Sequence, residues 1–80
     1  MGKKILLVDD DDALRESLAE QLELHEEFEP KGVGTAKEGL DLVKDEYFDV
    51  ILLDVGLPDM GGREACRLMR CGGVKSPIIM

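Results

Sequence analysis

Short runs of apolar residues alternate along the chain with longer segments in which apolar residues recur every three to four positions. The apolar runs cover about residues 4–8, 28–33, 50–53 and 76–80. Their lengths and their β-branched residues are typical of strands. The periodic segments between them, which predict helices, are about residues 11–26, 35–45 and 63–70. Because strands and helices alternate in the order βαβαβαβ, we expect an α/β fold with a parallel sheet and right-handed crossovers.

The second apolar run is the weakest of the four as a strand, since it contains Pro30 and Gly32. Proline cannot donate to the hydrogen-bond ladder in the middle of a sheet, so this strand is predicted at an edge, outside the first strand. The third strand then lies on the other side of the first. The predicted order is 2-1-3-4, a flavodoxin-like sheet with its topological switch point between strands one and three.

The first predicted helix has an acidic start and a single apolar stripe. Asp11 or Asp12 is expected to cap it by accepting from free N–H groups of its first turn. Arg15 falls among the glutamates on the predicted solvent side, and His25 near the end is expected to be solvated. The stripe consists of Leu14, Leu18 and Leu22.

The second and third predicted helices carry signals at opposite ends. Thr35 and Glu38 have the spacing of a capping box, so the second helix is expected to begin there, although Gly39 lowers its propensity. Gly72 and Gly73 are expected to end the third helix.

Acidic residues end the first and third strands. Asp9 to Asp12 follow the first strand directly, and Asp54 follows the third. The carboxyl ends of parallel strands meet at one edge of a sheet, so Asp9, Asp10 and Asp54 can share a pocket. Close carboxylates repel by roughly 4 kcal/mol per pair at an effective dielectric of about 20, so a cation is expected. Hard oxygen ligands favour Mg²⁺, Mn²⁺ or Ca²⁺ over zinc. The alternative for Asp54 is a solvated aspartate at a strand end.

Length and charge limit the classes of function. Eighty residues allow one small domain, spanning residues 1–80. Lys and Arg number 10 against 18 for Asp and Glu, a net charge of -8, which argues against nucleic acid or an anionic membrane as a direct partner. Two cysteines and one histidine give no readable zinc site. No apolar run approaches the roughly 20 residues of a membrane span, and we expect a soluble, cytoplasmic protein.

Two separated motifs carry a resemblance to a known family. They are Lys4-Ile5-Leu6-Leu7-Val8-Asp9-Asp10-Asp11 and Leu52-Leu53-Asp54-Val55-Gly56-Leu57-Pro58-Asp59-Met60-Gly61-Gly62. Together they resemble the receiver domain of two-component response regulators, with a CheY-like fold. The resemblance implies that Asp54 accepts a phosphoryl group from a histidine kinase. It also implies that Asp9, Asp10, Asp54 and the main-chain carbonyl of Gly56 bind Mg²⁺. Such a chain is not an enzyme in the turnover sense.

Other families that bind cations or phosphate fit the residues less well. An EF-hand beginning at Asp9 would need glycine where Leu14 stands. A haloacid-dehalogenase-type phosphatase would need a second acid where Gly56 stands. A flavin or dinucleotide site would need a Gly-rich or Ser/Thr-rich first loop instead of four aspartates.

The resemblance also implies a truncated receiver. In the family, a Ser or Thr after the fourth strand and a Lys after the fifth contact the phosphoryl group, and neither position occurs before Met80. The last helix, strand and helix are expected to be missing, so that residues 78–80 form an exposed edge strand beside an uncovered sheet face. The alternative function is therefore a receiver-derived module that no longer switches and self-associates, most simply as a homodimer.

Overall fold

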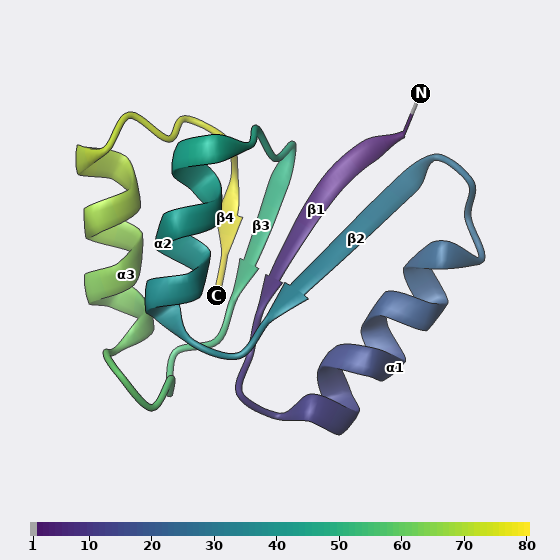
Figure 1. Ribbon diagram of the computed structural model, residues 1–80, viewed down its shortest axis with the longest axis horizontal. Helices are drawn as coiled ribbons and strands as arrows, with labels where there is room; N and C mark the ends of the chain where they lie inside the picture. The colour runs from purple at the N-terminus through teal and green to yellow at the C-terminus, as the bar shows by residue number, and fades with distance from the viewer. Residues whose placement is uncertain (1) are drawn as a thin grey trace.

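Four parallel strands form one sheet in the order β2-β1-β3-β4 in the computed structural model, which describes residues 2–80 (Figure 1). This confirms the predicted order and the edge position of the strand that contains Pro30. The strands are β1 (Lys3–Val8), β2 (Phe28–Val33), β3 (Val50–Leu53) and β4 (Ile78–Ile79).

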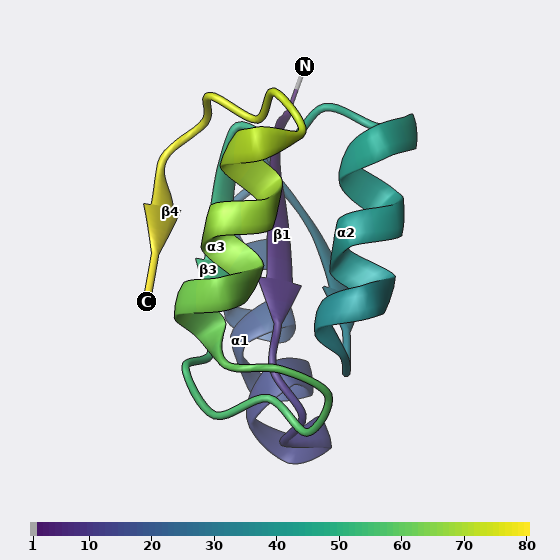
Figure 2. The same ribbon diagram turned by 90° about the vertical axis from the view of Figure 1, so that its left-hand side faces the viewer.

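Three helices connect the strands and lie on both faces of the sheet. They are α1 (Asp12–Glu23), α2 (Ala36–Asp45) and α3 (Gly62–Cys71). Across the sheet, the chain moves one way from β1 to β2 and the other way from β2 to β3 and from β3 to β4. Because such connections are right-handed, α1 lies on one face of the sheet, and α2 and α3 lie on the other. Figure 2 shows α2 and α3 together, with α1 behind them. None of the helices formed by residues 2–80 has the length and apolar character needed to cross a bilayer.

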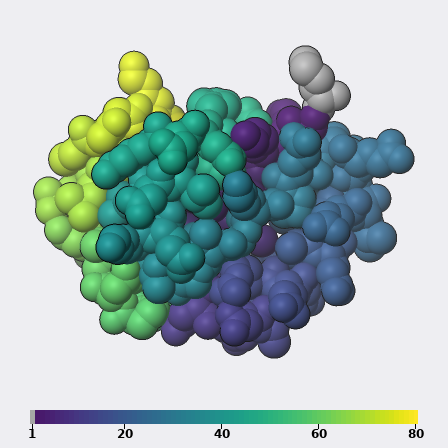
Figure 3. All heavy atoms as spheres, in the orientation of Figure 1, coloured from purple at the N-terminus to yellow at the C-terminus, as the bar shows by residue number. Residues whose placement is uncertain are grey.

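The main hydrophobic core lies between the sheet and the pair α2 and α3. Leu6 and Val8 of β1 are 0% and 1% exposed and belong to this core, as does Met69 of α3. The alternate residues Ile5 and Leu7 are buried towards the other face, as the period of two along a strand requires. In Figure 3, α2 covers the middle of the sheet and leaves only small parts of β1 visible.

The first helix is shorter and less buried than its sequence predicts. It ends at Glu23 instead of about residue 26, because backbone hydrogen bonds from His25 to Leu22 and from Phe28 to His25 turn the chain directly into β2. The helix packs mainly over the edge strand β2, so none of its residues is buried, and Leu14 is 47% exposed. The acidic cap is Asp11, whose side chain accepts from the Leu14 N–H.

The ends of α2 and α3 follow the predicted signals. Thr35 caps α2 by accepting from the Glu38 N–H, and α3 is followed by Gly73 with a φ of 98°. Gly39 is buried in α2, where an added Cβ would lie 3.0 Å from Val8 Cγ2. The glycine that weakens the helix by propensity therefore lets the helix approach β1 closely.

Asparagine in place of Gly61 should stabilise the protein. Gly61 is the N-cap of α3 and supplies no side-chain acceptor, and an added Cβ would come no closer than 4.0 Å to the Val55 carbonyl oxygen. An asparagine there can accept from the free N–H groups of the first turn, so Gly61→Asn should raise the free energy of unfolding by about 0.5 kcal/mol. Urea unfolding with an unchanged m-value measures this gain. Gly61→Ala adds a Cβ without an acceptor, and equal stability in the two variants would contradict the capping explanation.

Candidate functional site

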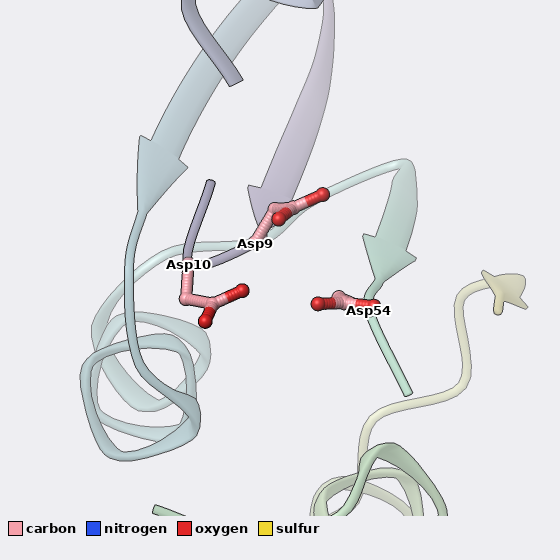
Figure 4. Close-up of side chains that lie close together, drawn as sticks. All are labelled: Asp9, Asp10 and Asp54. Carbon is pink, nitrogen blue, oxygen red and sulfur yellow. The ribbon is translucent and has the colours of Figure 1, made fainter. Parts of the chain in front are cut away.

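Three carboxylates meet at the carboxyl edge of the two central strands. Val8 of β1 pairs with Leu53 of β3, so the residues that follow them, Asp9 and Asp54, leave the sheet side by side. The Asp54 N–H continues the ladder by donating to the Val8 carbonyl at 2.9 Å. One carboxylate oxygen from each of Asp9, Asp10 and Asp54 lies within 4.8 Å of the others (Figure 4). The structure thus brings together the three acids that the sequence places at this edge.

Local hydrogen bonds orient two of these carboxylates. The Asp11 N–H donates to Asp9 Oδ1 at 2.9 Å, and the Gly56 N–H donates to Asp54 Oδ1 at 3.3 Å. Each bond comes from a residue two positions later, the pattern of an Asx turn. Asp9 and Asp54 are half-buried, whereas Asp10 is exposed. The pocket therefore has two oriented acids at its base and a third at its solvent side.

Arg15 contacts the backbone of this site, although its position on the predicted helix suggested a solvated side chain. Its guanidinium donates to the Asp9 carbonyl at 2.6 Å and to Asp12 Oδ1 at 2.6 Å, and its side chain is 20% exposed. The aliphatic part crosses β2 at Gly32, where an added Cβ would lie 2.7 Å from Arg15 Cδ. The glycine in the weak edge strand was the one sequence signal of this contact.

The loop that follows Asp54 is closed at its base. Gly56 and Gly61 form an antiparallel bridge, and the Gly62 N–H donates to the Val55 carbonyl at 2.9 Å. Leu57 is 7% exposed and holds the underside of the loop in the core. Met60 packs against the same core, as its apolar character predicts. The carbonyl of Gly56 lies in this fixed loop, and its role as a metal ligand stays a prediction.

Asp59 connects the same loop to α2. Its two carboxylate oxygens accept from the Ala36 and Lys37 N–H groups, each at 2.9 Å. These two bonds hold the pKa of the Asp59 carboxyl below its ordinary range. The partners of Asp59 lie more than 20 positions earlier in the chain, so no local sequence pattern predicts this contact.

The donor atoms of the acidic pocket fit a small divalent cation. All are carboxylate oxygens, which suit Mg²⁺ better than softer metals. Ligands at about 2.1 Å from one octahedral ion lie about 3.0 to 4.2 Å apart, so oxygens within 4.8 Å of each other need only a small adjustment. Among residues 2–80, no other group of three His, Cys, Asp or Glu side chains comes close enough to bind a metal. The free cysteines, Cys66 and Cys71, lie on α3.

Comparisons with known proteins agree on one family. The family model described as the response regulator receiver domain matches residues 5–80. The cell cycle response regulators CtrA of Brucella ovis and Brucella abortus are each 40% identical to this chain over 77 residues, covering 96% of it. The matched part is 33% of each relative, so the chain spans about a third of their length.

Solved structures give the same result. A CheY-like response regulator receiver domain from Methanospirillum hungatei is 38% identical with a TM-score of 0.84, and the match covers 98% of this chain and 63% of that one. The response regulator TrrA of Thermotoga maritima, solved with Mg²⁺-BeF, is 31% identical with a TM-score of 0.88, and the match covers 98% and 67%.

Proposed function

This chain belongs to the response regulator receiver domain family of two-component signalling, and from this premise we propose that Asp54 is its phosphoryl acceptor. The donor is the phosphohistidine of a histidine kinase, and Mg²⁺ is the cofactor. The observation that carries the proposal is the convergence of Asp9, Asp10 and Asp54 within 4.8 Å at the ends of adjacent parallel strands. Three negative charges in so small a space are stable only with a cation or with strong solvation.

The position of Asp54 suits an in-line attack on phosphorus. One oxygen is held by the Gly56 N–H, which orients the carboxylate, and the side chain is half-buried, so it is reachable from solvent. An Asp54 oxygen forms a bond to phosphorus while the bond from phosphorus to the imidazole nitrogen of the donor breaks, and that nitrogen keeps the electron pair. The attacking atom is a carboxylate oxygen with no hydroxyl or thiol proton to remove, so the step needs no general base from the protein. The product is an acyl phosphate.

Asp9, Asp10, Asp54 and the Gly56 carbonyl are the proposed ligands of Mg²⁺. When bound, the ion supplies positive charge that offsets the repulsion between these acids and an incoming phosphoryl group. Arg15 supports the site by holding the Asp9 carbonyl at 2.6 Å and thereby the backbone that presents Asp9. The complex of the Thermotoga relative with Mg²⁺-BeF supports the choice of metal.

The product of this reaction is the modified protein itself, so the proposed function is a signalling switch without turnover of an external substrate. The direct partner is the kinase, and a cytoplasmic location goes with that partner. A net charge of -8 supports the proposal that this segment does not itself bind nucleic acid.

An intact mass spectrum after incubation with a small-molecule phosphodonor tests the proposal. The expected result is a phosphoryl adduct that forms with Mg²⁺ and does not form when the metal is chelated. A folded protein that gives no adduct under either condition would overturn the role of Asp54.

Self-association is the second candidate function, and one surface favours it. A hollow of about 210 Å³ opens on the α1 side of the sheet, between the acidic site at Asp9 and Asp54 and the end of β4, and Leu18 and Leu52 form part of its apolar lining. Ile79 and Met80 on its rim are 55% and 56% exposed, and β4 is an edge strand. Apolar side chains beside an open strand edge are suited to pairing with a second copy.

Light scattering tests the second candidate. If β4 pairs two copies, the chain of 8.8 kDa should scatter as a dimer, and Ile79→Lys should return it to a monomer because a charge on the edge opposes pairing. Leu24→Lys is the matched control, since Leu24 is an exposed apolar residue next to the end of α1, outside this surface. A monomeric protein at all micromolar concentrations would exclude this function.

A further inference from the structure

The loop between β3 and α3 is held at three places, and one of them reaches outside the acidic site. Its base is closed by the bridge between Gly56 and Gly61, and its underside is held by buried Leu57. Its tip is held by Asp59, whose two oxygens each accept one N–H group of α2 at 2.9 Å. The metal-site loop and the N-terminus of α2 are therefore joined by a bidentate contact.

This contact differs from ordinary helix capping because the capping group comes from elsewhere in the chain. Within α2 itself, Thr35 already caps the helix by accepting from the Glu38 N–H. Asp59 takes the remaining N–H groups of the first turn, those of Ala36 and Lys37. A carboxylate at a helix N-terminus is further stabilised by the helix dipole. Two caps thus stabilise the same helix end, but only one of them ties the loop down.

We propose that Asp59 is a positioning residue for the cation site: by binding the N-terminus of α2, it fixes the loop that presents the Gly56 carbonyl beside Asp54. The inference rests on the proposed function, since it assumes that this loop contributes to Mg²⁺ binding. Groups that orient metal ligands commonly change metal affinity when they are removed. Without Asp59, the loop keeps its apolar underside but loses the contact that fixes its tip.

The hydrogen bond between Gly56 and Asp54 connects the position of the loop to the proposed Mg²⁺ site. The Gly56 N–H donates to Asp54 Oδ1 while its carbonyl is the proposed ligand, so one residue both orients the acceptor and completes the ligand set. Gly56 is only three residues before Asp59, so release of the tip also loosens the bridge between Gly56 and Gly61 and lets the Gly56 peptide group turn. The expected consequence is weaker Mg²⁺ binding without loss of the fold.

The test compares Asp59→Ala with Thr35→Ala in the whole chain. Both variants remove a cap from α2 and should lower the melting temperature of the metal-free protein by similar amounts. Mg²⁺ titrations followed by amide chemical shifts of residues 54–56 then measure affinity. Asp59→Ala should weaken Mg²⁺ binding about tenfold, whereas Thr35→Ala should leave it unchanged. Asp59→Asn, which keeps one acceptor and the size of the side chain, should fall between wild type and Asp59→Ala.

Each outcome decides a different point. If the wild-type protein shows no saturable Mg²⁺ binding, the proposed metal site is wrong and the inference fails with it. If the wild type binds and Asp59→Ala binds equally well, only the inference is wrong, and Asp59 is a helix cap and nothing more. Equal losses of affinity in Asp59→Ala and Thr35→Ala would likewise assign the effect to α2 and overturn the positioning role. If Asp59→Ala does not fold, the comparison is made with Asp59→Asn.

Discussion

Replacing Asp54 with asparagine should abolish the Mg²⁺-dependent phosphoryl adduct completely. Asparagine preserves the shape of the side chain and can still accept from the Gly56 N–H, which lies 3.3 Å from Asp54 Oδ1. Its amide oxygen carries no full negative charge, so it cannot serve as the nucleophile that forms an acyl phosphate. Intact mass spectrometry of wild type and variant, each incubated with the same phosphodonor and Mg²⁺, measures the loss.

Asp49→Asn is the matched control for this prediction. Asp49 precedes β3, whereas Asp54 follows it, so the two aspartates lie at opposite ends of this strand. Asp49 Oδ2 accepts from the Lys4 N–H at 2.8 Å, a bond that an asparagine oxygen can also make. The Asp49 variant should therefore be phosphorylated as wild type is. An adduct that persists in Asp54→Asn, or that disappears equally in both variants, would contradict the assignment of Asp54.

Asp54→Asn should leave the fold intact. Asp54 lies beside two other carboxylates within 4.8 Å, and removing one charge from such a group relieves repulsion in the metal-free protein. Asp54→Asn should consequently be at least as stable as wild type in urea when Mg²⁺ is absent. This separates loss of the nucleophile from loss of the folded state.

The sheet and its acidic edge could be predicted from sequence because local patterns determine them. Continuous apolar runs identified β1 and β3, and Pro30 placed β2 at the edge. Parallel pairing of β1 with β3 then makes the convergence of Asp9 and Asp54 a geometric consequence, since residues that follow two paired strands emerge together. The cap at Thr35 is also local, because its acceptor and donor lie three positions apart.

The contacts that support the site were missed because they join distant parts of the chain. Asp59 binds a helix end that lies 23 positions away, and nothing near Asp59 in sequence indicates that partner. Arg15 sits on the helix face expected to be solvated, yet its long side chain folds back across Gly32 to the Asp9 carbonyl. The predicted burial of Leu14 was wrong for a different reason. The helical periodicity places Leu14 on the apolar face of α1, but the helix packs over the edge of the sheet, and Leu14 in its first turn stays 47% exposed. Periodicity predicts the face of a helix, and only the packing shows how much of that face is covered.

Replacing Gly62 with alanine should destabilise the protein and displace the acceptor. A Cβ at this position would lie 2.7 Å from the Asp54 carbonyl oxygen and 2.7 Å from Val55 Cα. Both are backbone atoms, so relief requires movement of the chain that carries Asp54. We expect a loss of about 3 kcal/mol in the free energy of unfolding, measured by urea denaturation, together with a smaller yield of the phosphoryl adduct.

The direction of this change in the free energy of unfolding distinguishes steric crowding at Gly62 from helix propensity. Gly62 is the first residue of α3 and does not have a positive φ, so on helix propensity alone alanine would be favourable, by up to about 1 kcal/mol. Gly61→Ala is the control, because its Cβ would meet nothing closer than 4.0 Å, and only a cost below about 1 kcal/mol is expected at an N-cap. If Gly62→Ala proved as stable as Gly61→Ala, the close approach of α3 to the Asp54 backbone would be wrong. A large cost at Gly62 would point to the space around this residue, because helix propensity favours alanine inside the helix and the N-cap preference alone costs less than about 1 kcal/mol at Gly61. It would show that the start of α3 holds the acceptor in place.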